Sequence, residues 1–154
     1  MKHLIRIISS FFYLGYVPFA PGIAGSLGAL GLYFLLRESF LAHTIALVVV
    51  IIVGFLISAQ AERLFGEKDS PRIVIDEVAG MLLALWALKL DLVLVIVGFF
   101  IFRALDAAKV YPSNKLEKLP GSWGVMSDDL CAGLYTNLVL QLVSRVLVNI
   151  WWVS

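Results

Sequence analysis

Two carboxylate pairs stand where polar stretches give way to apolar runs. Asp76-Glu77 precedes one run, Asp128-Asp129 precedes another, and each pair is followed one helical turn later by an Ala-Gly step. An ionisable group at the edge of an apolar segment is costly beside lipid and is usually kept for a function. Simple helix capping is the alternative for either pair alone. Two pairs at one membrane face, among only eleven acids in the chain, favour a functional site.

The glycines after the two pairs predict how the pairs meet. Gly80 follows Asp76 by four residues, and Gly133 follows Asp129 by four. Glycine lets a neighbouring backbone approach closely, so the pattern predicts two acid-bearing helix starts side by side. The helix dipole favours negative charge at such starts, which accounts for part of the pattern as local stabilisation.

Two further clusters carry groups that could bind an anion. Arg103, Asp106 and Lys109 are spaced by three, which places them at neighbouring positions on one helical surface. A solvated helix end with two weak ion pairs is the alternative for this cluster. Residues 21–26 are predicted to form a glycine-punctuated loop that leads into a helix, where backbone donors bind anions readily. A plain Pro/Gly turn is the alternative there.

Together the clusters predict a magnesium-dependent phosphate site. Hard carboxylate oxygens suit Mg²⁺, which commonly binds through one or two carboxylates plus a substrate phosphate. Such a metal neutralises phosphate charge and can generate a hydroxide nucleophile, while Arg103 or Lys109 could stabilise the transferring phosphoryl group. The predicted roles are metal binding by Asp76, Glu77, Asp128 and Asp129, phosphate binding by Gly22, Gly25, Ser26, Arg103 and Lys109, and catalysis by Asp76, Asp106, Lys109 and Asp129.

The remaining reactive side chains exclude other chemistries. His3 and His43 lie far along the chain from the acidic clusters, which argues against a histidine base or a phosphohistidine. Cys131 is the single cysteine, so the chain has no internal disulfide and no cysteine-rich metal site. It also lacks the arginine-bearing loop of a cysteine phosphatase, and its apolar neighbours predict a packing role.

The composition is that of an integral membrane protein. Of the 154 residues, 61% are hydrophobic and 15% are charged, and the mean hydropathy is +0.96. Soluble domains carry roughly a quarter charged residues, so a water-soluble fold of this length could not bury so much apolar surface. We expect a single membrane-embedded domain over residues 1–154. The net charge of +1 gives no argument for nucleic acid binding.

The apolar runs predict an all-α, polytopic fold with about four membrane-embedded helices and an interfacial N-terminal helix. About 20 apolar residues span a bilayer, and residues 41–61 are the clearest such run. The run over 78–102 is broken at Lys89-Leu90-Asp91, which favours a hairpin of two short helices. The expected segments are an interfacial helix near 4–14, membrane helices at about 26–36, 41–61, 78–102 and 130–153, and an aromatic anchor at Trp151-Trp152.

The basic residues predict the orientation of this fold. In the hairpin topology nine lysines and arginines fall on one side, against Arg37, Lys89 and Arg145 on the other. Because basic loops favour the cytoplasmic side, we expect the polar loops and the site to face the cytosol.

Four segments resemble the phosphatidylglycerophosphatase A family: residues 18–30, 74–80, 102–112 and 119–133, in family order. The resemblance implies magnesium-dependent removal of the terminal phosphate of phosphatidylglycerophosphate, yielding phosphatidylglycerol, at the cytoplasmic membrane of a bacterium. Ile23 stands where the family usually has threonine, and Ser26 is the hydroxyl that could substitute for it. The family motifs fall on Asp76, Glu77, Asp106, Lys109, Asp128 and Asp129.

Other readings stay open at this point. A small cation transporter or channel would use the same acids, but it needs charges along helix interiors, and the apolar runs carry only Lys89, Asp91 and Arg145. A catalytically inactive relative that binds anionic lipid, a cation or an assembly partner is supported by Ile23. A phosphatase for another lipid phosphate is the third alternative.

Overall fold

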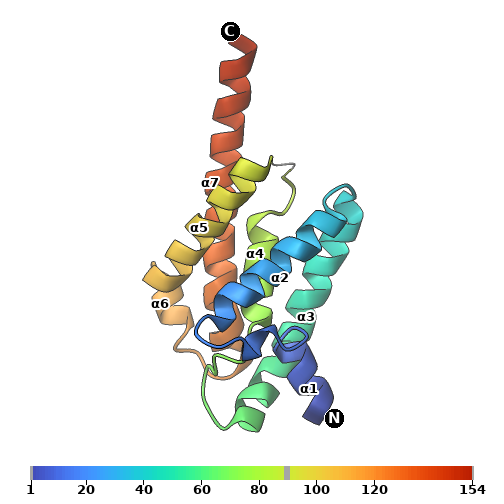
Figure 1. The fold of residues 1–154 in the computed structure, drawn as a ribbon. Coiled ribbons are helices and arrows are strands. Elements are labelled where there is room, and N and C mark those ends of the chain that lie inside the picture. Colours follow the sequence, from blue (N-terminus) through green and yellow to red (C-terminus); the bar gives the residue numbers. More distant parts are fainter. Residues whose placement is uncertain (1, 89–90, 154) are drawn as a thin grey trace.

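The described part of the chain is entirely helical and carries no strand. The computed structural model describes the backbone of residues 2–88 and 91–153 and side chains up to Val146. It confirms the predicted all-α class (Figure 1). The elements are α1 (Lys2–Ser9), the 3₁₀ turn η1 (Leu14–Tyr16), α2 (Pro21–Leu36), α3 (Phe40–Phe65), α4 (Ile75–Ala84), α5 (Leu92–Ala108), α6 (Ser113–Leu116) and α7 (Ser122–Val153).

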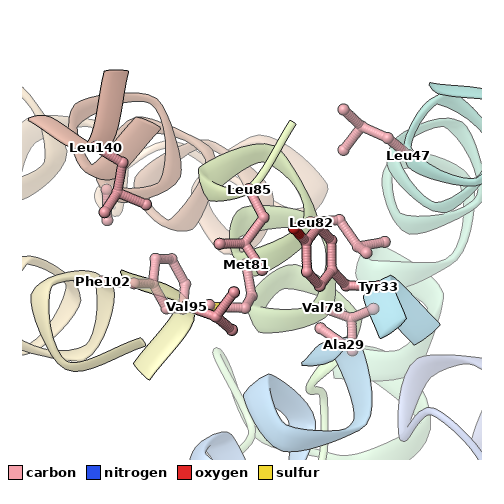
Figure 2. Packing of buried hydrophobic residues seen from close by; sticks show 11 residues of the cluster. Ala29, Tyr33, Leu47, Val78, Met81, Leu82, Leu85, Val95, Phe102 and Leu140 are labelled. Atoms are coloured by element: carbon pink, nitrogen blue, oxygen red, sulfur yellow. The ribbon is translucent and has the colours of Figure 1, made fainter. Parts of the chain in front are cut away.

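Helix α4 is the centre of the molecule. Eight of its ten residues are buried, and it packs against α7, α2, α3 and α5. Figure 2 shows Val78, Met81 and Leu82 of α4 meeting side chains from the surrounding helices. At about 1.5 Å per residue, α4 is only about 15 Å long. Its neighbours bury every residue of it except Glu77 and Leu83, which are partly exposed.

Helices α4 and α7 cross at two glycines. A Cβ atom at Gly133 would overlap the carbonyl oxygen of Gly80, and a Cβ at Gly80 would lie 2.7 Å from the carbonyl oxygen of Asp129. The backbones therefore touch where any side chain would separate them. This confirms the predicted glycine-mediated contact, and it brings the start of α4 against the acidic turn of α7.

The outer surface of the bundle is apolar. Among the described residues, α3 is the helix long and apolar enough to cross a membrane, with a mean hydropathy of 2.8 over its best window. Only 17% of that window is buried, so α3 is not the core helix of a soluble fold. This confirms that the apolar run at 41–61 forms a helix with the length and composition of a membrane span, and it indicates a membrane protein. Exposed apolar side chains continue the surface at Ile45, Val48, Val49, Ile52 and Leu56 of α3, Val93, Ile96, Val97 and Phe100 of α5, and Leu134, Leu138 and Leu142 of α7.

Two predicted boundaries are wrong at the N-terminal side. α1 ends at Ser9 rather than near 14, because the chain then turns through Phe11, Phe12 and Tyr13 at positive φ. Residues 21–26 are not a loop, since α2 begins at Pro21. Proline suits the first position of a helix, where its missing N–H would have no partner, so the Pro-Gly pair starts the helix rather than delaying it.

The later boundaries give one confirmation and one correction. The broken run over 78–102 forms two helices, α4 and α5, as the hairpin prediction required. The pair Asp128-Asp129 is not at a helix start, because α7 begins six residues earlier at Ser122, directly after Gly121 at φ +57. Lys89 and Leu90, and the side chains of Trp151 and Trp152, lie outside the described residues.

Candidate active site

A polar cavity of about 230 Å³ opens between the start of α4, the end of α5 and the first turns of α7. Every charged residue predicted for the site lines it, which confirms that the hairpin returns α5 to the acids of α4. The loop between α3 and α4 completes the wall. The charged lining residues are Asp69, Asp76, Glu77, Arg103, Asp106, Lys109, Asp128 and Asp129.

The first turn of α4 supplies one buried carboxylate, Asp76, and one partly buried carboxylate, Glu77. Asp76 is 6% exposed and accepts a hydrogen bond of 3.0 Å at Oδ1 from the N–H of Glu77. Carboxylates in a first helical turn are stabilised by the helix dipole. Glu77 Oε2 is buried, yet no described residue donates a hydrogen bond to it. A buried carboxylate oxygen without a hydrogen-bond donor is unfavourable, and a bound cation would stabilise it.

Helix α7 adds Asp128 and Asp129, each 4% exposed. Asp129 belongs to two groups of carboxylates: Asp76, Glu77 and Asp129 each offer an oxygen within 4.8 Å of the others, as do Asp106, Asp128 and Asp129. Because Asp129 is common to both groups, it is the carboxylate at the centre of the cavity.

The cations of the site lie at the C-terminal end of α5. Arg103 Nη1 is 2.9 Å from Asp106 Oδ2, and Lys109 Nζ is 3.6 Å from Asp106 Oδ1, which confirms that the three side chains lie at neighbouring positions on one helical surface. Lys109, at φ 46, ends α5 in the left-handed conformation. Its ammonium also donates a hydrogen bond to Asp128 Oδ2, so it ties α5 to α7.

The charge of Lys109 is secured by this setting. Burial disfavours its ammonium form, but the hydrogen bond to Asp128 and the negative charge of the surrounding aspartates outweigh burial and raise the pKa of Lys109 above the ordinary lysine value. Lys109 therefore stays protonated at neutral pH, which suits charge stabilisation and not general-base catalysis.

The two carboxylate groups differ in how their charge is balanced. Asp106 and Asp128 are paired with Arg103 and Lys109. In the described chain no lysine or arginine nitrogen forms an ion pair with Asp76, Glu77 or Asp129. Carboxylates removed from water without an ion-pair partner are costly. We call this second set the acidic triad; it is the part of the cavity in which no ion pair forms among the described residues.

The N-terminus of α2 touches the site at one residue. A Cβ at Gly22 would overlap Glu77 Oε1 and lie 3.2 Å from Arg103 Nη2, so glycine leaves room for both side chains. Gly25 instead packs against Val74. The Ser26 hydroxyl is buried and donates a hydrogen bond of 3.0 Å to the Gly22 carbonyl. Of the three predicted phosphate contacts on this segment, the fold brings only Gly22 to the acids.

Sequence reasoning missed two polar residues of the cavity wall, Asp69 and Ser70. Asp69 has φ +50, and its N–H donates to Glu62 Oε1 at 2.8 Å. Burial raises the pKa of the Asp69 carboxyl, and the charge of Lys109 opposes that rise. Their place in the sequence could have indicated them. A polar Asp-Ser-Pro turn lies only a few residues before the helix that begins with the acids, so its side chains are expected near those acids.

The histidine and cysteine side chains that the sequence excluded from the site lie outside the cavity, as predicted. Neither His43 nor Cys131 lines the cavity. The His43 ring is buried and its Nε2 lies 3.1 Å from the carbonyl oxygen of Leu82, near the opposite end of α4. A site of buried acids, one arginine and one lysine, without histidine or cysteine, is equipped for phosphoryl transfer by charge stabilisation. Fold and site together fit a helical membrane phosphohydrolase.

Comparison with known proteins identifies the family. Residues 7–144 match the family described as phosphatidylglycerophosphatase A. The chain belongs to this family of lipid phosphatases, which are phosphoric monoester hydrolases. It is 33% identical to phosphatidylglycerophosphatase A of Escherichia coli over 94% of this chain and 86% of that protein. It is 29% identical to the phosphatidylglycerophosphatase A of Haemophilus influenzae over 88% of this chain and 86% of that protein.

A further relative carries a different description. A protein of Bacteroides thetaiotaomicron described as a candidate phosphatidylinositol-3-phosphatase is 35% identical over 92% of this chain and 94% of its own length. The chain thus resembles proteins described by two different phospholipid headgroups, each bearing a phosphate monoester. No solved structure matches the chain.

Proposed function

We propose that the protein hydrolyses the terminal phosphate monoester of phosphatidylglycerophosphate to phosphatidylglycerol in a Mg²⁺-dependent reaction. Family membership and the two relatives named for this activity support the substrate. The observation that carries the reaction type is the acidic triad, largely buried and without an ion pair among the described residues, beside Arg103 and Lys109 in one cavity.

The acidic triad fits a divalent hard cation. Asp76, Glu77 and Asp129 would hold Mg²⁺, because they offer clustered oxygens and one of these, Glu77 Oε2, lacks any donor among the described residues. When bound, the metal supplies charge neutralisation for the phosphate and an acidified water. Asp128 was expected to be a ligand too, but its contact with Lys109 supports a positioning role.

The cations of α5 act on the phosphate itself. Arg103 Nη1 lies close to Asp106 but outside hydrogen-bond geometry, which leaves that N–H without an acceptor among the described residues. A phosphoryl oxygen is the acceptor that the proposed reaction brings. Lys109 adds a second fixed positive charge. Asp106 orients both cations. When water attacks phosphorus, the bond to the glycerol oxygen breaks, and that oxygen takes up a proton in exchange for the one that the attacking water loses.

The proposed membrane arrangement surrounds α4 with α2, α3, α5 and α7. With 16 and 17 residues, α2 and α5 are about 24 and 26 Å long, close to the hydrocarbon thickness of about 30 Å. Figure 1 shows α1 and the loop from α3 to α4 at one end of the bundle. The turn from α2 to α3 lies at the other end. Basic residues are concentrated at the first end, which supports a cytosolic cavity at the cytoplasmic membrane of a bacterium.

The first test is phosphate release by detergent-purified protein from phosphatidylglycerophosphate and from phosphatidylinositol 3-phosphate, each with Mg²⁺ and with EDTA. We expect Mg²⁺-dependent release, faster from phosphatidylglycerophosphate, and its loss in EDTA. Release that persists in EDTA would remove the metal from the proposal. Preference for the inositol lipid would transfer the substrate assignment to the headgroup of the Bacteroides relative.

Gly22→Ala is expected to weaken Mg²⁺ activation about tenfold without unfolding the protein. The new methyl group overlaps only the end of the flexible Glu77 side chain, so the carboxylate moves and the backbone does not. The measurement is the Mg²⁺ concentration for half-maximal turnover, together with the melting temperature. Gly31→Ala on the same helix is the matched control, because nothing lies within 4 Å of its Cβ. Equal Mg²⁺ dependence in the two variants would separate Gly22 from the metal site.

A further inference from the structure

Ser70 is a buried hydroxyl in the cavity wall that the reaction proposed above does not use. It lies in the loop between α3 and α4, is 1% exposed, and lines the cavity with the acids and Arg103. No described residue forms a hydrogen bond with its Oγ. Its carbonyl accepts a hydrogen bond of 2.8 Å from the N–H of Ile73, and Pro71 follows it. A tight turn therefore fixes the backbone at Ser70.

An unbonded hydroxyl in such a place is unusual. Buried polar side chains nearly always have a partner, and leaving one unpaired is costly. The cavity wall offers carboxylates as acceptors, yet none of them takes the Ser70 hydrogen. A ligand bound in the cavity would supply the missing acceptor. In a cavity that already holds an arginine and a lysine for an anion, the matching group is a phosphoryl oxygen, which accepts hydrogen bonds only.

We propose that the Ser70 hydroxyl donates a hydrogen bond to a non-bridging oxygen of the bound phosphate monoester. The proposal rests on the lipid phosphatase function and adds a substrate contact to it. A nucleophilic role is disfavoured, because attack by Oγ would require a base within hydrogen-bond reach to take its proton, and the described residues place none there.

The test compares Ser70→Ala with Ser70→Thr and with Ser58→Ala. Ser70→Ala is expected to raise both the KM for phosphatidylglycerophosphate and the inhibition constant of inorganic phosphate about tenfold, with a smaller change in kcat. Ser70→Thr keeps the hydroxyl and should retain near wild-type constants. Ser58 is equally buried but is bonded to the Gly54 carbonyl within α3, outside the cavity. Ser58→Ala should leave both constants unchanged.

Stability gives a second, opposite readout. Because the Ser70 hydroxyl bonds to no described residue, Ser70→Ala should melt at the wild-type temperature or higher while it binds phosphate more weakly. A lower melting temperature with unchanged phosphate inhibition would make Ser70 a structural residue and overturn the proposal. A changed KM for the lipid with an unchanged inhibition constant for inorganic phosphate would place the contact on the glycerol, which also overturns it. A trapped phosphoserine at position 70 would do the same.

Phosphate binding by Ser70 and hydrolysis of the lipid are measured separately. If the wild-type protein releases no phosphate from either lipid, the proposed function fails. Calorimetric titration of the protein with inorganic phosphate in Mg²⁺ then still decides the role of Ser70. Weaker binding by Ser70→Ala than by Ser58→Ala supports the contact, and equal binding by the two variants rejects it.

Discussion

Asp129→Asn is expected to lower turnover about a hundredfold or more while the protein remains folded. Asp129 is the carboxylate shared by both acidic groups and is 4% exposed at the centre of the cavity. Asparagine has the same shape but cannot supply the negative charge that a divalent cation requires. The measurement is phosphate release at saturating lipid across a range of Mg²⁺ concentrations.

The stability of the same variant should change in the opposite sense. Without metal, the carboxylates of Asp76, Glu77 and Asp129 face one another in a buried cavity with no ion-pair partner in the described chain. Removing one negative charge relieves that repulsion, so Asp129→Asn should melt at or above the wild-type temperature in EDTA. Mg²⁺ should raise the melting temperature of the wild-type protein, since a ligand that binds only the folded state stabilises it, and should barely affect the variant.

Asp91→Asn is the control for removal of an aspartate charge. Asp91 caps α5 at the end opposite Arg103 and Lys109, and its Oδ1 accepts a hydrogen bond of 2.8 Å from the N–H of Leu94. This variant should lose a little stability and keep both its turnover and its response to Mg²⁺. Near-normal turnover in Asp129→Asn, or a full Mg²⁺ shift in its melting temperature, would take Asp129 out of the metal site.

Local spacing was enough to predict the charged part of the site. Arg103, Asp106 and Lys109 are close because a three-residue spacing on one helix makes them so, whatever the rest of the fold does. The contact between α4 and α7 was also predictable, because Gly80 and Gly133 repeat the same offset from an aspartate and glycine permits close helix packing. These predictions needed only helix geometry and the cost of placing charge beside lipid.

The boundaries and the loop contacts depend on information that local patterns do not carry. The sequence Pro21-Gly22 is compatible with a turn and with a helix start. In the fold it starts α2, with Gly22 close to Glu77 and Arg103. Asp128 was placed at a helix start because the apolar run begins after it, although α7 starts at Ser122. Ser70 is buried although it lies in the loop between α3 and α4, and no rule of residue spacing predicts the burial of a loop residue.

Gly133→Ala is expected to destabilise the protein by about 1–3 kcal/mol or more and to reduce turnover severely. Its Cβ would overlap the carbonyl oxygen of Gly80, which belongs to the backbone of a central, enclosed helix. A side chain could rotate away from such an overlap, but a helix backbone must shift as a unit. The measurements are the melting temperature in detergent and the fraction of monodisperse protein after heating.

Gly133→Ala should also disturb the site, because on each helix the glycine at the crossing lies one turn from an aspartate of the acidic triad. Gly133 is four residues from Asp129, and Gly80 is four from Asp76. Any displacement of α7 from α4 therefore separates two members of the acidic triad. We expect the protein that still folds to need more Mg²⁺ for half-maximal turnover, as Gly22→Ala does, but with a lowered melting temperature that Gly22→Ala should not show.

Gly31→Ala gives the reference for a glycine that only weakens its helix. Nothing lies within 4 Å of its Cβ, in the middle of α2, and alanine favours a helix by up to about 1 kcal/mol over glycine. Gly31→Ala should thus be as stable as the wild-type protein or more so, with unchanged turnover. If Gly133→Ala behaved in the same way, the two backbones could not be in contact at Gly80, and the assembly of the acidic triad would need another explanation. If only Gly133→Ala loses stability and turnover, the geometry of the acidic triad depends on the absence of a methyl group at position 133.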